Sequence, residues 1–135
     1  MSFSQMVKIL REQNKGKIVF INAGVFYIAV EEDAVLLNKK LKLKCSCFKE
    51  ETCKVGVPIN VIEKYLEKIE KLGYSYIVYN FNKEKGTLMV IKEFKGKPNK
   101  TIRKSINCLI CKGEKKYLDD KYMLALRRHF QQQIR

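Results

Sequence analysis

The chain has no apolar stretch long enough to cross a bilayer. Its longest such run, Val25 to Val30, is far shorter than the roughly 18 residues that a membrane-spanning helix needs. The N-terminus also lacks the basic residues and following apolar segment of a secretory signal peptide. We therefore expect no membrane partner and a cytoplasmic protein, in a reducing compartment.

Residues that carry common enzymatic chemistry are scarce. The single histidine, His129, has no serine motif or carboxylate pair to accompany it. The pair Asp119 and Asp120 is better explained as the cap of a last helix than as a metal-binding pair. We expect His129 to lie at the surface or edge of the fold, and we expect the protein not to be an enzyme.

The five cysteines are odd in number, which excludes a fully paired disulfide framework within one chain. Cys108 and Cys111 have the spacing of half a zinc site, and Cys45 and Cys47, with Cys53, would supply the other half. The alternatives are buried or inert thiols, because free cysteine behaves as a small hydrophobe, and a redox role for the C-x-x-C pair. No cofactor is expected, with zinc as the alternative.

Positive charge, in contrast, is abundant. The chain has 28 Lys+Arg against 14 Asp+Glu, a formal net charge of +14. This balance favours a polyanion as partner, although lysines that only cover solvated faces would give the same composition. Most of the cations are lysines, which contact phosphate as point charges, whereas the edges of bases are read best by bidentate arginine. The charge predicts affinity for a nucleic-acid backbone rather than recognition of a base sequence.

The candidate phosphate contacts gather in the C-terminal part of the chain. They begin in a basic linker that also contains glycine and proline, and they end in an amphipathic last helix. They are Lys95, Lys97, Lys100, Arg103, Lys104, Lys112, Lys115, Lys116, Arg127 and Arg128. The alternative is a solvated tail. We place one domain at residues 1–95, with the linker, the C-x-x-C segment and the last helix at residues 96–135 packed on the same domain.

Hydrophobic periodicity predicts alternating helices and strands. Apolar residues at three-to-four spacing predict helices, and β-branched, aromatic or alternating runs predict strands. The expected helices are 3–13, 33–40 and one beginning near residue 58 and ending at 72; the expected strands are 18–21, 26–30, 42–48, 53–57, 74–81 and 87–94. This order predicts an α/β or α+β domain with a mixed sheet flanked by helices.

The stretch Gly24-Val25-Phe26-Tyr27 places two aromatic rings beside a glycine, where the backbone turns sharply and a ring can be presented to a partner. On a basic chain, stacked nucleobases are the obvious partner for such a ring. Phe26 and Tyr27 are therefore the candidate aromatic contacts.

Several short motifs follow one another in a recognisable order. They are Gly24-Val25-Phe26-Tyr27, Glu32-Asp33-Ala34, Val55-Gly56-Val57-Pro58, Tyr65-Leu66 and Lys71-Leu72-Gly73-Tyr74. Their order resembles the N-terminal mismatch-recognition domain, domain I, of the MutS family, in which a G-x-F-Y-E turn precedes G-E-D-A and an A-G-V-P segment opens a helix. The likeness covers Phe3 to Phe81 and implies the same mixed sheet flanked by helices.

The resemblance implies that Phe26 wedges into a DNA duplex beside a mispaired or unpaired base. In the family, the glutamate of G-x-F-Y-E bonds to that base, but Ile28 occupies its place here. Without the carboxylate we expect weaker discrimination. Alternatively Phe26 and Ile28, which share a strand face by their two-residue spacing, are both core residues.

The chain contains no G-x-x-x-x-G-K-[ST] nucleotide-binding motif, so we do not expect it to act by itself as a nucleotide-driven clamp. The leading hypothesis is a non-enzymatic nucleic-acid-binding protein of DNA mismatch recognition and repair, with DNA favoured and RNA or an RNA–DNA hybrid also open. The second is an accessory protein-interaction subunit of a polymerase, reverse transcriptase or nuclease. The third is a thiol- or metal-dependent enzyme at Cys108 and Cys111.

Overall fold

The computed structural model describes residues 2–47, 52–98, 122, 125–126 and 128–130. Helices and strands alternate along most of this length. The elements are α1 (Phe3–Gln13), β1 (Lys17–Ala23), β2 (Phe26–Val30), α2 (Glu31–Leu41), β3 (Cys45–Cys47), β4 (Cys53–Pro58), the 3-10 helix η1 (Ile59–Val61), α3 (Ile62–Leu72), β5 (Ser75–Asn82) and β6 (Thr87–Phe94). The described residues from 122 to 130 are also helical.

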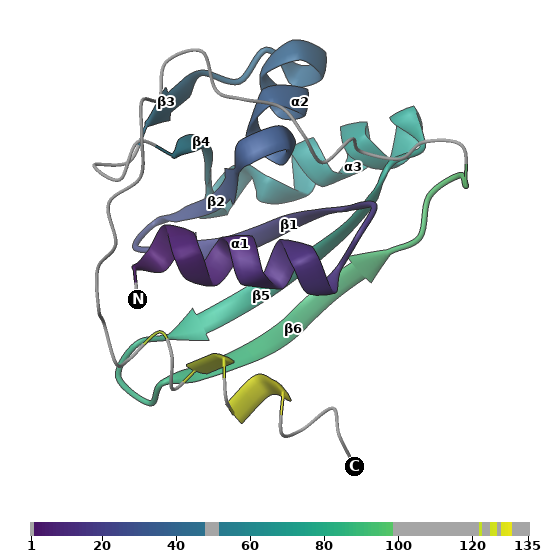
Figure 1. Ribbon diagram of the computed structural model, residues 1–135. Coiled ribbons are helices and arrows are strands. Elements are labelled where there is room, and N and C mark those ends of the chain that lie inside the picture. Colours follow the sequence, from purple (N-terminus) through teal and green to yellow (C-terminus); the bar gives the residue numbers. More distant parts are fainter. Residues whose placement is uncertain (1, 48–51, 99–121, 123–124, 127, 131–135) are drawn as a thin grey trace.

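The strands form one mixed sheet in the order β3-β4-β2-β1-β5-β6 (Figure 1). β1 pairs with β5 in parallel, and the other pairings are antiparallel. The parallel pair requires a long connection, which α2, β3, β4 and α3 provide. This architecture confirms the mixed sheet with helices that the sequence predicts.

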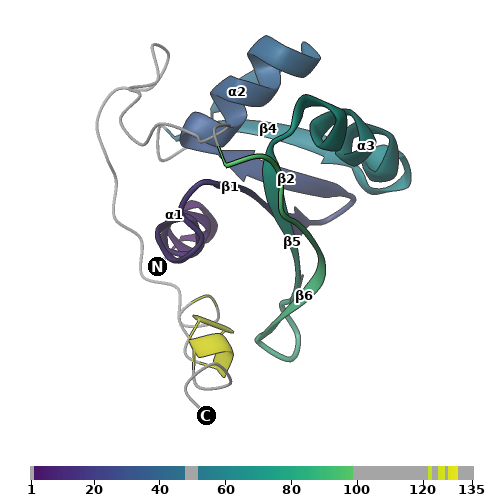
Figure 2. The same cartoon turned by 90° about the vertical axis from the view of Figure 1, so that its right-hand side faces the viewer.

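One face of the sheet is covered by α1 and the C-terminal helical residues. Ser2 caps α1, since its side chain accepts from the backbone of Gln5 while the Gln5 side chain accepts from the backbone of Ser2. The apolar side of α1 packs on residues of β1, β2 and β5, and Ala125 and Leu126 join the same core. Figure 2 shows both helical segments on this side of the sheet.

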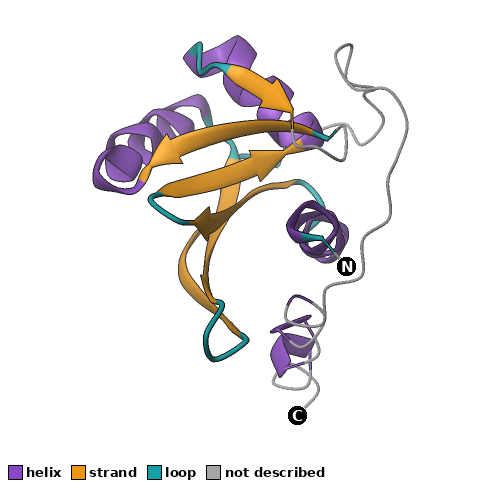
Figure 3. Cartoon of the chain, turned by 90° about the vertical axis from the view of Figure 1, so that its left-hand side faces the viewer, coloured by secondary structure: helices purple, strands orange, loops and turns teal. Residues whose placement is uncertain are grey.

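The opposite face is covered by α2 and α3 (Figure 3). Leu37 of α2 and Leu66 and Ile69 of α3 are buried against side chains of β1, β2, β4 and β5. Gly73 ends α3 in the left-handed conformation with φ of 88°, which favours glycine. The middle of the sheet is therefore buried on both sides, with a separate apolar core on each.

The ion pair between Asp33 and Arg11 joins the two layers of helices. Asp33, at the start of α2, is fully buried and accepts from Arg11 Nε at 2.9 Å, from Arg11 Nη2 at 3.4 Å and from the backbone N–H of Val19 at 3.0 Å. Burial raises the pKa of Asp33 to about 6, and the charge of Arg11 and the Val19 hydrogen bond oppose this shift. One carboxyl thereby ties α2 to α1 and to β1.

The predicted strand at residues 42–48 is shorter in the structure. Helix α2 extends to Leu41, and Lys42 follows it with a left-handed φ of 57°, so β3 begins only at Cys45. The Asn38 side chain donates to the Leu43 carbonyl at 2.7 Å and holds this connection. The apolar and polar residues that alternate before Cys45 therefore form the end of a helix and the connection to β3, not a strand. Residue 48 lies outside the described residues.

Two predicted helix starts are also displaced. Helix α2 begins at Glu31, earlier than the predicted Asp33. Pro58 is the last residue of β4, where it is the strand partner of Phe26, and η1 precedes the start of α3 at Ile62. Tertiary pairing with β2 extends the strand to a residue that by its chemistry also suits a helix start.

Candidate nucleic-acid interface

The turn between β1 and β2 presents the motif that the sequence singles out. Ala23 and Phe26 form the last pair of the two strands, and Gly24 and Val25 connect them. Gly24 has a φ of +61°, a left-handed conformation that glycine adopts without steric cost. The turn leaves Val25 70% exposed and Phe26 42% exposed.

A third apolar side chain joins this turn from a distant part of the sequence. The backbone N–H of Ile59 donates to the Val25 carbonyl at 2.9 Å, and the Ile59 side chain is 42% exposed. We call Val25, Phe26 and Ile59 the apolar tip. Ile59 was not among the predicted contacts, although its position directly after the V-G-V-P motif, outside the stripe of α3, was a signal.

The two neighbouring rings of the motif lie on opposite faces of β2. Tyr27 is 7% exposed and belongs to the core under α2 and α3. Burial raises the pKa of its hydroxyl, and the carboxylate of Glu63 adds to this effect. The alternation of a strand therefore leaves Phe26 as the exposed ring and makes Tyr27 a core residue, although the sequence analysis grouped them as contacts.

Gly56 of β4 explains how Phe26 lies. It pairs with Ile28, and a Cβ atom built on it would lie 3.4 Å from Ile28 Cδ1 and 3.5 Å from Phe26 Cδ1. The Phe26 ring thus lies against the sheet over the glycine, with one side open. Ile28, at the place of the family's glutamate, is 6% exposed in the core under α1. Both the residue and its surroundings are therefore apolar.

Basic residues lie at the same end of the sheet as the tip. Lys83 and Lys85 are exposed in the turn between β5 and β6. Arg128 Nη1 donates to the carbonyls of Lys85 and Gly86, the second at 3.3 Å, so this predicted phosphate contact also holds the last helix to the turn. This segment was predicted only as a hairpin turn, and its two lysines were not among the predicted contacts, although the N-K-E-K-G sequence was a signal.

Lys95 and Lys97 are exposed, but the structure places them at the other end of the sheet. The N–H of Gly96, between them, donates to Ser75 Oγ at 2.8 Å, and the N–H of Lys97 donates to the Gly73 carbonyl at 2.8 Å. β1 runs from this end to Ala23, the strand partner of Phe26, so the two sites lie roughly 20 Å apart at the rise of a strand. The structure does not bring them together with Phe26.

The remaining candidate phosphate contacts lie outside the described residues and stay predictions. They are Lys100, Arg103, Lys104, Lys112, Lys115, Lys116 and Arg127. The cap predicted at Asp119 or Asp120 lies outside them too.

Three cysteines lie on the paired strands β3 and β4. Cys45 Sγ and Cys53 Sγ lie 2.9 Å apart, and Cys47 is the strand partner of Cys53. Within the described residues, no three histidine, cysteine or acidic side chains are grouped to hold a metal ion. Cys108 and Cys111 lie outside these residues, so the zinc site stays a prediction.

His129 is buried rather than at the surface, which corrects the sequence-based expectation. It is 5% exposed, its Nε2 lies 3.5 Å from the Tyr79 hydroxyl, and the two rings meet edge to face with centroids 5.2 Å apart. Burial lowers the pKa of His129. The last helix packs on β5, and His129 follows Leu126 by three residues, a spacing that places both on the same face of the helix.

The fold and the apolar tip together define a class of domain. The sequence model of the family MutS domain I matches residues 1–116, and the chain belongs to this family. The motifs of the β1–β2 turn and of β4 lie within that match.

Two curated relatives are DNA mismatch repair proteins named MutS. The protein from Finegoldia magna is 29% identical over 85 residues, which cover 58% of this chain and 10% of the relative. The protein from Thermotoga petrophila is 25% identical over 114 residues, which cover 84% of this chain and 13% of the relative. The chain therefore corresponds to a small part of each relative. Of the helices in the described residues, none is both long and apolar enough to cross a membrane.

Proposed function

We propose that this chain is a non-catalytic DNA-binding domain that binds irregular or mismatched duplexes, with Phe26 inserting its ring between bases. The observation that carries the proposal is the half-exposed ring of Phe26 on the turn that carries the family's motif. Apolar side chains that enter the stack unstack a base step and bend the duplex. Val25 and Ile59 enlarge the apolar surface that follows the ring into the groove.

Charge supplies the affinity in this proposal. The net charge of +14 attracts the phosphate backbone, and Lys83, Lys85 and Arg128 lie at the end of the sheet that carries the ring. Lys95 and Lys97 would contact a more distant part of the same duplex. Because Ile28 replaces the family's glutamate, Phe26 would sense how easily a base step opens rather than which base is present.

Replacement of Phe26 tests this function. We expect Phe26→Ala to lower the affinity for mismatched and bulged duplexes about tenfold, the size of one lost stacking interaction, and to lower the affinity for matched duplex less. Fluorescence anisotropy with matched, mismatched, bulged, single-stranded and hybrid probes across a salt series measures both effects. The salt slope, about −0.9 per neutralised phosphate on duplex DNA, should stay unchanged because the variant removes no charge.

Two control variants sharpen the test. Val25→Ala shortens a more exposed neighbour on the same turn and should lower the affinity less than Phe26→Ala does, whereas Phe26→Leu keeps an apolar side chain but loses the flat ring. Equal affinity of wild type and Phe26→Ala for every probe, with both proteins folded, would reject the wedge. A flat salt response would reject the phosphate contacts.

A second candidate function is the accessory subunit of another nucleic-acid enzyme. The observation that favours it is the edge strand β6, where Met89, Val90 and Ile91 are 60%, 41% and 49% exposed. A strand of a partner protein would extend the sheet there through backbone hydrogen bonds. If none of the five probes binds even at low salt, this function replaces the first one.

A further inference from the structure

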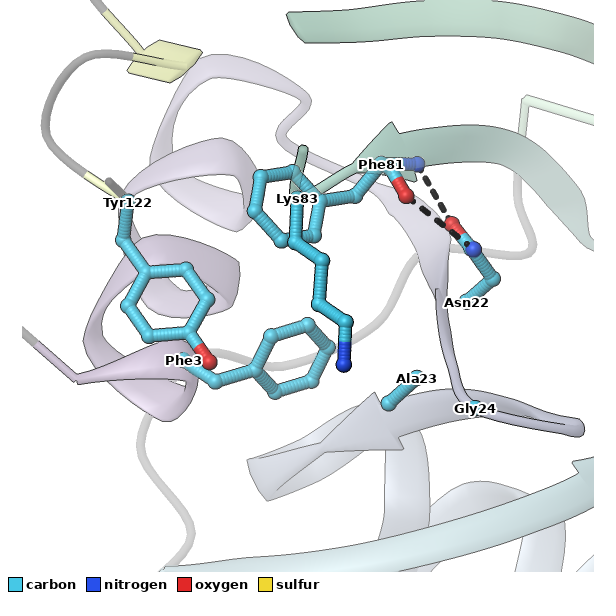
Figure 4. Close-up of a pocket in the computed structure, with 7 residues that line it drawn as sticks. All are labelled: Phe3, Asn22, Ala23, Gly24, Phe81, Lys83 and Tyr122. Carbon is cyan, nitrogen blue, oxygen red and sulfur yellow. Dashed lines mark hydrogen bonds between the residues drawn. The ribbon is translucent and has the colours of Figure 1, made fainter. Parts of the chain in front are cut away.

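A cavity of about 450 Å³ opens beside the apolar tip, on the face of the sheet that α1 covers (Figure 4). Its volume falls within the roughly 300–1,000 Å³ of small-molecule sites. Elements far apart in the sequence form its wall: the start of α1, the β1–β2 turn, the end of β5 and the last helix. Its lining includes the side chains of Phe3, Ala23, Phe81, Lys83 and Tyr122.

Three aromatic rings line this cavity. The Phe81 and Tyr122 ring centroids lie 5.4 Å apart with 36° between the planes, and those of Phe3 and Tyr122 lie 5.7 Å apart at 64°. Phe81 is buried, whereas Phe3 and Tyr122 are only partly buried. Flat faces of this kind attract a flat ring, since stacking on aromatic side chains is favourable for every nucleobase.

Among the described residues that line the cavity, Lys83 carries a positive charge and none carries a carboxylate. Figure 4 shows the Lys83 side chain among these lining residues. The amide of Asn22 is already used, because it donates to the Phe81 carbonyl at 3.2 Å and accepts from the Phe81 N–H. This double hydrogen bond holds the ends of β1 and β5 together and stiffens the wall. Aromatic faces beside an ammonium suit a ligand with a flat ring and a negative charge.

The cavity is directly next to the proposed wedge. Ala23, on its wall, is the strand partner of Phe26, and paired residues of antiparallel strands have Cα atoms about 4.5–5.5 Å apart. Both side chains point to the same face of the sheet. A base pushed out of the stack by Phe26 would therefore meet this cavity first.

We propose that the cavity binds an unpaired nucleobase, which stacks on the rings while its phosphate contacts Lys83. The proposal rests on the proposed function and adds to it the class of lesion: a duplex with an extrahelical nucleotide rather than a base–base mispair. The absence of the family's glutamate at Ile28 fits this class of lesion, because in this proposal the cavity contacts the base after it has left the stack and no carboxylate is needed within the stack.

Two bulged duplexes test the proposal. One carries an unpaired adenine, and the other carries an abasic residue at the same position, so the backbone charge and the bend are matched and only the base differs. We expect wild type to bind the adenine bulge about tenfold more tightly, which corresponds to one stacked base. Tyr122→Leu should reduce this ratio towards one.

Lys83→Ala has a matched control in Lys85→Ala, which removes the same charge from the same turn outside the cavity. We expect Lys85→Ala to weaken binding to both duplexes equally and Lys83→Ala to weaken binding to the adenine bulge more. If Tyr122→Leu fails to fold, the comparison of these two lysine variants still tests the proposal. Equal affinity of wild type for the two bulges would overturn it and would leave the proposed function intact.

A titration of the chain with deoxyadenosine monophosphate, followed by NMR, tests the cavity without a duplex. Shifts of the Phe3 and Lys83 signals, without shifts at Lys85, would support the cavity even if no duplex binds, in which case only the proposed function fails. The absence of shifts up to about 10 mM nucleotide would reject the cavity as a base site, as equal binding of both bulges would.

Discussion

The two faces of the sheet end differently at the β1–β2 turn. On the face under α2 and α3, the core continues to the end of β2, where Tyr27 is 7% exposed. On the face under α1, the cover stops earlier, so Phe26 is 42% exposed and a cavity lined by Phe3, Phe81 and Tyr122 opens beside it. Both faces bury aliphatic side chains along the middle of the same strands.

This difference shows that the covering helices, and not the motif alone, determine that the Tyr27 ring is buried and the Phe26 ring is exposed. Two adjacent aromatic residues on one strand differ in role because one face is closed and the other is open. The proposed site lies where the helices leave aromatic surface uncovered next to positive charge. The following predictions test this separation between a closed and an open face.

The largest effect is expected at the closed face. Tyr27→Ala should lower the free energy of unfolding by about 3–4 kcal/mol, because it leaves a cavity in a packed core. Phe26→Ala should lower it by about 1 kcal/mol, because the ring is already partly in solvent. Urea unfolding followed by circular dichroism measures both values. Similar losses for the two variants would mean that Phe26 is a core residue and would break the comparison.

The next effect concerns the link between the two faces. Asp33→Ala should lower the free energy of unfolding by about 3 kcal/mol at pH 7, because it leaves Arg11 and the Val19 N–H without their buried partner. The pKa of Asp33 in the folded state, about 6, lies above its usual value of 3.8. Because its pKa is raised on folding, Asp33 stabilises the folded state most below pH 3.8, and this stabilisation is lost as the pH rises through 6.

The difference between wild type and Asp33→Ala should therefore grow as the pH falls from 7 to 5. Asp33→Asn, which removes the titration but keeps the size of the side chain, serves as the control and should show a flatter pH dependence. Urea unfolding at several pH values measures the series. A difference that shrinks on acidification would show that the ion pair with Arg11 outweighs burial.

The smallest effect concerns the last helix on the open face. Burial lowers the pKa of His129 below its usual 6.5, so the stability that the neutral ring contributes is fully present above pH 6.5 and is lost as the pH falls through the lower folded-state pKa. The advantage of wild type over His129→Gln should shrink on acidification by less than about 1.4 kcal/mol per pH unit, the limit for one proton. Hydrogen exchange at Tyr79 should rise in parallel; exchange that does not depend on pH would contradict the prediction.

Sequence patterns predicted most of the fold. The stripe of α3 and its stop at Gly73 and the paired runs that form β5 and β6 are confirmed, because local periodicity and glycine punctuation carry these features. The strand predicted from residue 42 was wrong at its start, because an alternating pattern does not distinguish a strand from a helix end followed by a turn.

The candidate site was less predictable. Phe26 was found from its motif, whereas Ile59 and Lys83 lie near it only because β4 and the β5–β6 turn end at the same side of the sheet. His129 was assigned to the surface because a single helix does not show which neighbours cover it.

The sequence by itself determined the alternation of helices and strands, the membership of the MutS domain I family and the excess of positive charge, because periodicity, motif order and composition are properties of the chain. Only the tertiary structure decided that Phe26 is open while Tyr27 is closed, that Lys95 and Lys97 lie at the far end from Phe26, and that three distant aromatic residues enclose a cavity. These features depend on which helix covers which part of the sheet, and that follows from packing between residues far apart in the chain.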